Sequence, residues 1–181
     1  MKLMVISDIH GSYYYINKAL EKFREEEADY IILLGDILYH GPRNPLPKEY
    51  NPSKVSTVLN ELKEKIISVR GNCDSEVDQL VLEFPMMSDY NVLFYNNKRI
   101  FVTHGHLFNE NNMPPLEDED VLIHGHTHLP VAKKTNNKYI LNPGSISLPK
   151  ENNPNSYGII EDDTFIIKDF EENIIKTINL V

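Results

Sequence analysis

Residues 3–10 read Leu3-Met4-Val5-Ile6-Ser7-Asp8-Ile9-His10, an apolar run that stops at a polar pair. Four consecutive apolar residues are typical of a strand that is buried on both faces. Residues two apart at a strand end point the same way, so Asp8 and His10 are placed to converge on one ligand. We therefore predict a buried strand with a polar site at its carboxyl end.

The next part of the chain predicts two helices and two more buried strands. One amphipathic helix starts at Ser12, a suitable N-cap, and another starts near Ser53. Apolar runs at 30–34 and 66–69 are expected to be strands. The β-α-β-α-β order implies a parallel sheet with right-handed crossovers. Residues 37–52 contain four prolines and predict an irregular loop, which at this length is usually functional or disordered.

From residue 90 onward the chain changes to short strands separated by turns. We expect strands at 90–95, 99–103, 121–124, 131–134, 139–141, 157–160, 165–168 and 174–178. The pairs 96–97, 136–137 and 162–163 are expected at hairpin tips. Because this many strands must cover both sheets, we expect two sheets packed face to face with helices outside. The 181 residues are expected to form a single domain, 1–181.

Composition excludes several classes of protein. The net charge of -9 would repel a nucleic-acid backbone over most of the surface, although bound cations can reverse the field locally. The single cysteine, Cys73, rules out an intramolecular disulfide and fits a reducing cytosol. The short apolar start meets a charge too soon for a signal peptide, and no run is long enough to span a membrane. We expect a soluble, cytoplasmic protein.

Polar motifs follow several of the predicted strands. They are Asp8-Ile9-His10, Gly35-Asp36, Gly71-Asn72-Cys73-Asp74, His104-Gly105-His106 and His124-Gly125-His126-Thr127-His128. A lone Gly-Asp is most often a turn, and a lone histidine more often caps or packs than binds a metal. The joint pattern favours metal binding, because carboxylate, amide and imidazole ligands recur at one end of successive strands.

These residue types suit a hydrolase with two metal ions. A carboxylate has two oxygens and can hold two ions roughly 3.5–4 Å apart, and Asp36 is the candidate bridge. Asn72 could ligate the second ion without adding negative charge. Imidazoles would come from His104, His126 and His128. Two such ions generate hydroxide at neutral pH and absorb the charge that develops on phosphoryl oxygens, which predicts a phosphoesterase.

The chain resembles the calcineurin-like metallophosphoesterase superfamily through motifs in the expected order. These are Asp8-x-His10, Gly35-Asp36, Gly71-Asn72, Thr103-His104-Gly105-His106 and Gly125-His126-Thr127-His128. The stretches 35–45, 70–78 and 142–145 extend the resemblance to the small bacterial YfcE-type phosphodiesterases over essentially the whole chain. The resemblance implies a four-layer α/β/β/α sandwich, a dinuclear site usually filled with manganese, and hydrolysis of phosphodiesters.

The resemblance also implies which residues hold each metal. The first ion would be held by Asp8, His10, Asp36 and His128, and the second by Asp36, Asn72, His104 and His126. A hydroxide between the ions would attack phosphorus in line. Manganese is the expected metal, but the same ligands accept iron, zinc, nickel or cobalt.

Cys73 is a departure from the wider superfamily. Many members have a histidine after Gly-Asn, which protonates the leaving oxygen, and here Cys73 stands in that place. A thiol with a pKa near ~8.5 is a poorer proton donor at neutral pH than imidazolium. We therefore predict faster cleavage of aryl than of alkyl esters, and equal rates across a leaving-group series would contradict this. A substrate contact and a packing role for Cys73 both remain open.

Other polar residues have weaker indications. His106 lies two residues from a predicted ligand and is favoured as a phosphate contact. The catalytic candidates are Asp36, Asn72, Cys73 and His106. His40 and Arg43 could clamp a phosphate oxygen or a leaving group, or could simply be exposed basic residues of their loop. His124 is better interpreted as a structural histidine. Residues 142–145 could turn backbone N–H groups toward the site or form an ordinary turn.

The sequence favours one of three classes of function. The leading one is a phosphodiesterase acting on a small-molecule phosphodiester, with no extended nucleic-acid ligand and no membrane. A non-catalytic metal-binding scaffold is the alternative, because the retromer subunit of eukaryotes has the same fold. A repair-type nuclease is disfavoured by the acidic composition and the absence of a capping domain. An exposed strand edge or helix face could support a homo-oligomer.

Overall fold

The first predicted strand is β1 (Lys2–Ile6), and its alternate residues face two different cores. Met4 and Ile6 pack on the helix side of the sheet. Leu3 and Val5 pack toward the second sheet. Both faces are therefore buried, as the apolar run predicted. The chain is described here by a computed structural model that covers residues 1–181.

A six-stranded mixed sheet contains β1 and has the strand order β11-β10-β9-β1-β2-β3. Its other strands are β2 (Tyr30–Leu33), β3 (Ile66–Ser68), β9 (Ser156–Glu161), β10 (Thr164–Asp169) and β11 (Ile174–Asn179). The strands β1, β2 and β3 are parallel, as their alternation with helices predicted. The strand β9 joins β1 in antiparallel register.

A five-stranded mixed sheet has the order β4-β5-β6-β8-β7. Its strands are β4 (Tyr90–Tyr95), β5 (Lys98–Thr103), β6 (Val121–Ile123), β7 (Pro130–Thr135) and β8 (Lys138–Pro143). All eight strands predicted beyond residue 90 are present in the two sheets. Asn96, Asn97, Asn136 and Asn137 have positive φ at the tips of the β4-β5 and β7-β8 hairpins, which confirms the predicted turns.

The two predicted helices begin close to their expected caps. In α1 (Tyr13–Glu25), the Ser12 side chain accepts a hydrogen bond from the Tyr15 N–H. The helix α2 (Pro52–Asn60) is capped by Asn51 and begins one residue before Ser53, because proline is tolerated in a first turn that needs no N–H. The short elements η1 (Lys63–Lys65) and α3 (Glu76–Gln79) were not predicted, since neither is long enough to show a period.

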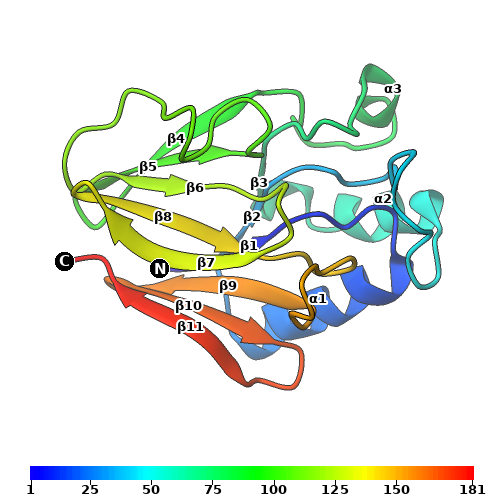
Figure 1. Cartoon of the computed structure of the whole chain (residues 1–181). Helices are drawn as coiled ribbons and strands as arrows, with labels where there is room; N and C mark the ends of the chain where they lie inside the picture. Colours follow the sequence, from blue (N-terminus) through cyan, green and yellow to red (C-terminus); the bar gives the residue numbers. More distant parts are fainter.

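The layers of the fold follow from three apolar clusters. One fills the space between the sheets, and the largest lies between the six-stranded sheet and the helices α1 and α2. Figure 1 shows these two helices on one side of the molecule and α3 apart from them. On the outer face of the five-stranded sheet, Phe101 packs with Phe108 and Leu116 of the segment 104–120, which contains no helix. The prediction of two mixed sheets flanked by helices is confirmed.

The loops that carry the polar motifs gather at one end of the molecule. In Figure 1 the carboxyl ends of β1, β6 and β8 point to the right, while both termini lie at the left. The segments after β1, β2 and β3 of one sheet therefore meet those after β5 and β6 of the other. None of the helices has both the length and the apolar character that a membrane crossing requires.

Candidate metal centre

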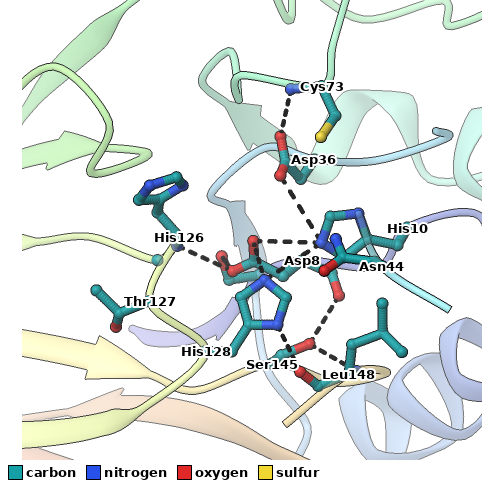
Figure 2. A network of polar contacts seen from close by, with 12 residues as sticks. Asp8, His10, Asp36, Asn44, Cys73, His126, Thr127, His128, Ser145 and Leu148 are labelled. Carbon is teal, nitrogen blue, oxygen red and sulfur yellow. Dashed lines mark hydrogen bonds and ion pairs between the residues drawn. The ribbon is translucent and has the colours of Figure 1, made fainter. Parts of the chain in front are cut away.

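The first group of predicted ligands comes from the loops after β1 and β6. Ligand atoms of Asp8, His10 and His128 all lie within 4.8 Å of one another. His128 Nε2 is 3.2 Å from Asp8 Oδ1 and 3.3 Å from His10 Nε2. Figure 2 shows these three side chains converging, with Asp36 beside them. His128, which comes from the other sheet, therefore joins Asp8 and His10 as the third predicted ligand of this group.

The second group comes from the loops after β3, β5 and β6. His104 Nε2 lies 3.1 Å from Asn72 Oδ1 and 3.2 Å from His126 Nδ1. Asn72 is exposed, His126 is half-buried and His104 is fully buried. The structure thus brings together amide oxygen and imidazole nitrogen donors that are far apart in the chain.

Asp36 connects the two groups through one oxygen. Its Oδ2 lies 3.7 Å from His10 Nε2 and 3.6 Å from His104 Nε2. Its Oδ1 accepts a hydrogen bond of 2.8 Å from the Cys73 N–H. From the sequence, both carboxylate oxygens were expected to serve the two ions, whereas in the structure Oδ2 alone faces both groups.

Three histidines are oriented by backbone carbonyls. The Nδ1 atoms of His10 and His104 contact the carbonyl oxygens of Tyr39 at 3.0 Å and Leu34 at 2.6 Å. His128 Nδ1 contacts the Leu148 carbonyl in the same way. Because a carbonyl only accepts, Nδ1 must carry the proton, and Nε2 presents its lone pair to the centre. This is the arrangement that metal-ligating histidines use.

Asp8 supplies a direct test of whether the residues fit a metal. Its Oδ2 accepts hydrogen bonds from Ser7 Oγ and from the His126 N–H. Its Oδ1 is buried and has no hydrogen-bond partner. A buried carboxylate oxygen without a partner is costly unless a cation satisfies it. Together with the inward-facing Nε2 atoms, this oxygen fits a divalent metal site.

The charges of the site favour the metal-binding forms of its residues. Burial alone would raise the pKa of Asp8, but the His128, His104 and His10 rings hold it below its ordinary value. Burial lowers the pKa of His10, and burial and the nearby His104 lower that of His126 to about 4. At neutral pH Asp8 is therefore ionised and the His10 and His126 rings are neutral. Burial opposes it, but the hydrogen bond and the charge of Asp8 raise the pKa of His128.

The backbone is held in an unfavourable conformation at five of the seven predicted ligands. Positive φ angles occur at Asp8 (56°), His10 (50°), Asp36 (52°), His126 (65°) and His128 (61°). Left-handed backbone at a residue other than glycine costs of order 1 kcal/mol or more, and such residues cluster at functional sites. The His10 N–H donates to the Asp36 carbonyl at 2.9 Å, so the two loops support each other.

Asp74 is a buried residue beside the ligands that was not among the site residues predicted from the sequence. Its buried carboxylate accepts three backbone N–H groups, from Asp36 and Ile37 at 2.8 Å and from Gly71 at 2.7 Å. Burial raises its pKa to about 6, so it is ionised at pH 7. Asp74 thereby joins the loop after β2 to the loop after β3. Its place two residues after Asn72 was the only signal in the sequence.

Residues 142–145 act through side chains as well as through their turn. Asn142 Nδ2 donates to the Gly125 carbonyl at 2.9 Å and to Thr127 Oγ1 at 3.0 Å. Ser145 Oγ donates to the Asp8 carbonyl at 2.9 Å, as does Ser147 Oγ at 2.8 Å. These bonds hold both loops of the first ligand group. From the sequence, this stretch was expected either to turn backbone N–H groups toward the site or to form an ordinary turn.

The remaining candidates lie at different distances from the ligands. Cys73 Sγ lies within 4.8 Å of ligand atoms of His10 and Asp36, and burial raises the pKa of its thiol. His106 is half-buried, with its ring centre 5.4 Å from that of His104 and its Nδ1 buried without a partner. The His40 ring packs between two tyrosines and does not line the cavity over the ligands.

That cavity has a volume of about 380 Å³ and a polar lining. Arg43 lines it, as does Lys150, which no sequence motif indicated. His124, in contrast, is buried behind the site, and its Nδ1 contacts Asn142 Nδ2 at 3.4 Å. The structural role expected for His124 agrees with this position.

Comparisons with known proteins identify the family. The family model described as the calcineurin-like phosphoesterase superfamily domain matches residues 1–164. The chain is 50% identical to phosphodiesterase YfcE of Escherichia coli over 167 residues, which is 92% of this chain and 91% of that protein. The solved structure of E. coli YfcE, described as a phosphoesterase, matches with a TM-score of 0.98 and 47% identity over all of both chains.

A more distant structure shows the same fold only. Vps29 of Entamoeba histolytica, solved in complex with zinc, matches with a TM-score of 0.62 and 20% identity over all of both chains. The family model covers most of the sequence, and the identity to YfcE extends over nearly the whole of both proteins. This chain therefore belongs to the calcineurin-like phosphoesterase superfamily.

Proposed function

We propose that this protein is a metal-dependent phosphodiesterase that hydrolyses small phosphodiesters at a dinuclear centre. The observation that carries the proposal is Asp36 Oδ2, which faces a ligand histidine of each group at nearly equal distances. The similarity to phosphodiesterase YfcE supports the same reaction. Two divalent ions, expected to be manganese, would supply Lewis acidity and a hydroxide nucleophile at neutral pH.

The predicted ligands would be divided between two metal ions, and basic residues of the cavity would bind the substrate. One ion would be held by Asp8, His10, Asp36 and His128, and the other by Asp36, Asn72, His104 and His126. Asp36 would contribute to both, since its Oδ2 faces both groups while its Oδ1 accepts from the Cys73 N–H. Arg43 and Lys150 line the cavity above and would attract the anionic substrate.

The leaving group would depart with little help from Cys73. Burial and the nearby Asp36 carboxylate raise the pKa of this thiol, so it is a weak acid. His106, whose Nδ1 is buried and unpartnered, is the better candidate to contact the phosphate. We therefore expect aryl phosphodiesters to be cleaved faster than alkyl ones, and rates measured across a leaving-group series test this directly.

A scaffold without catalysis is less well supported. The likeness to Vps29 is one of fold at 20% identity, and fold does not determine activity. No predicted ligand is replaced by an apolar residue, so the chain keeps the full set of ligands that metal-dependent hydrolysis requires. A small substrate is favoured over nucleic acid because the net charge is -9.

The proposal is tested by reconstituting the metal-free protein with manganese and assaying it against a panel of phosphate esters. We expect bis(para-nitrophenyl) phosphate to be hydrolysed. Asp36→Asn should lower kcat by at least about a hundredfold and reduce the manganese content, because both ions depend on this carboxylate. Asp118→Asn, at an exposed residue, is the matched control. An inactive wild-type protein with a full manganese content would refute the proposal.

A further inference from the structure

A second cavity shares a wall with the one over the metal ligands. It is a groove of about 610 Å³, within the range of small-molecule sites. Cys73 lines both cavities, and its Sγ lies within 4.8 Å of ligand atoms of Asp36 and His10. A ligand bound at the centre could therefore extend one substituent into this groove.

The groove is predominantly apolar and partly open to solvent. Its apolar lining consists of Leu38, Tyr39, Tyr50, Pro52, Val77 and Val81. Of these, Tyr39 is 42%, Val77 67% and Val81 49% exposed. Large apolar side chains that cluster at an exposed surface are typical of binding sites. The grouping is notable here because the neighbouring cavity is polar.

The aromatic wall of the groove is fixed in place. The His40 ring packs edge-on against Tyr39 at 4.8 Å and against Tyr50 at 5.1 Å between ring centres. Gly11 leaves room for the Tyr50 ring, because a Cβ at residue 11 would lie 2.5 Å from that ring. A wall that is already ordered loses little entropy when a ligand binds. His40 thus has a role in spacing the two tyrosines.

The charges of the two cavities differ. No lysine, arginine or histidine lines the groove, and its only charged side chain, Asp78, is bonded by the Ser75 N–H and hydroxyl. The cavity over the ligands holds Arg43 and Lys150. A phosphodiester has one anionic phosphoryl group and two ester arms. The phosphoryl group suits the charged cavity, and an uncharged arm suits the groove.

We propose that this groove binds one ester arm of the substrate and selects an apolar arm, of which an aryl group is the simplest form. The proposal rests on the proposed phosphodiesterase function, because the groove would extend the substrate site over the metal ligands. It predicts that affinity depends on the arm itself, separately from how readily that arm leaves.

The test measures binding and does not depend on turnover. Calorimetry would give the Kd of the manganese-loaded protein for diphenyl phosphate and for dimethyl phosphate, at a temperature where product analysis shows that neither diester is hydrolysed during the titration. Whichever arm occupies the groove, diphenyl phosphate fills it and dimethyl phosphate does not. We expect diphenyl phosphate to bind about tenfold more tightly or better, since a phenyl ring leaves water for an apolar wall.

Variants assign the difference to the groove. Val77→Asp and Val81→Asp place charge in its wall and should remove most of the preference for diphenyl phosphate. Leu80→Asp is the matched control, because Leu80 is 83% exposed in the same segment and lies outside the groove. The manganese content of each variant, measured by elemental analysis, shows whether the centre is intact.

The outcomes separate this inference from the proposed function. Equal Kd values for the two diesters would overturn the groove assignment, as would an equal loss of preference in Leu80→Asp. Failure of the manganese-loaded protein to hydrolyse bis(para-nitrophenyl) phosphate would instead count against the phosphodiesterase itself. Hydrolysis of bis(para-nitrophenyl) phosphate without any preference in binding would support the phosphodiesterase and contradict the groove assignment.

Discussion

At the scale of single residues, the site is organised so that each carboxylate uses one oxygen for the protein and offers the other. Asp8 is held through Oδ2 and Asp36 through Oδ1. The histidines follow the same rule, with Nδ1 bonded to a carbonyl and Nε2 facing inward in His10, His104 and His128. Such anchoring fixes the direction of each lone pair before a metal arrives.

His126 gives a pH-dependence that belongs to this scale. The folded protein holds its pKa at about 4, against 6.5 for the free side chain. As the pH falls, the unfolded chain therefore binds a proton at a higher pH than the folded protein does. The stability that is fully present above pH 6.5 is lost as the pH falls toward 4. Because the side chain is half exposed, solvent screening reduces the loss to about 1–2 kcal/mol.

Urea unfolding of the metal-free protein would measure this loss. The His126→Gln variant lacks the titrating group. On acidification, the free energy of unfolding of the wild type should therefore fall by more than that of the variant. Parallel stability curves for the two proteins over this pH range would contradict the assignment.

At the scale of elements, the site depends on the loop after β2 meeting the loop after β3. Asp74 makes this junction with three backbone N–H groups. Gly71 makes it possible, because a Cβ there would lie 2.1 Å from Asp36 Oδ1. The junction sets where Asp36 lies relative to both ligand groups.

Asp74→Asn tests the junction. Both carboxylate oxygens of Asp74 accept backbone N–H groups, so an amide must turn its NH₂ toward at least one of them. We expect the free energy of unfolding to fall by about 2–3 kcal/mol and manganese content to fall with it.

Asp78→Asn is the matched control for this experiment. Asp78 accepts from the Ser75 N–H and hydroxyl through Oδ2 alone, so an amide can keep both bonds through its oxygen. It should retain its manganese and lose less than about 1 kcal/mol. A fully metal-loaded Asp74→Asn protein of unchanged stability would show that the junction is not needed.

At the scale of the whole molecule, the centre lies where the carboxyl ends of two sheets meet. Figure 1 shows this end opposite both termini. The six-stranded sheet supplies Asp8 and Asp36, and the five-stranded sheet supplies His104 and His128. The apolar cluster between the sheets therefore also fixes the distance between ligands of different sheets.

The net charge of -9 gives a prediction at this scale. Long-range repulsion of an anionic substrate is weak and is screened by salt, so kcat/KM for bis(para-nitrophenyl) phosphate should stay constant or rise by less than about twofold between about 20 and about 200 mM salt. The protein should also pass through a DNA column at low salt. A steep fall of kcat/KM with salt would indicate a basic recognition surface and contradict the prediction.

Local patterns in the amino-acid chain were enough to predict the elements and the donor types. The apolar runs before Asp8, Asp36 and Asn72 predicted parallel strands with polar ends, and the asparagine pairs predicted the hairpins. These features are local, since period and turn chemistry depend on neighbouring residues. Resemblance of the motifs to a known family supplied the division of the ligands between two ions.

Which atoms meet at the site depends on the folded arrangement of the whole chain. That Asp36 presents Oδ2 alone, that Asp74 joins two loops, and that Lys150 lines the cavity all depend on contacts between distant segments. The groove beside Cys73 likewise requires the loop after β2, the start of α2 and the segment around α3 to pack together. No periodic pattern encodes such contacts, because they arise from how two sheets and their loops fill space.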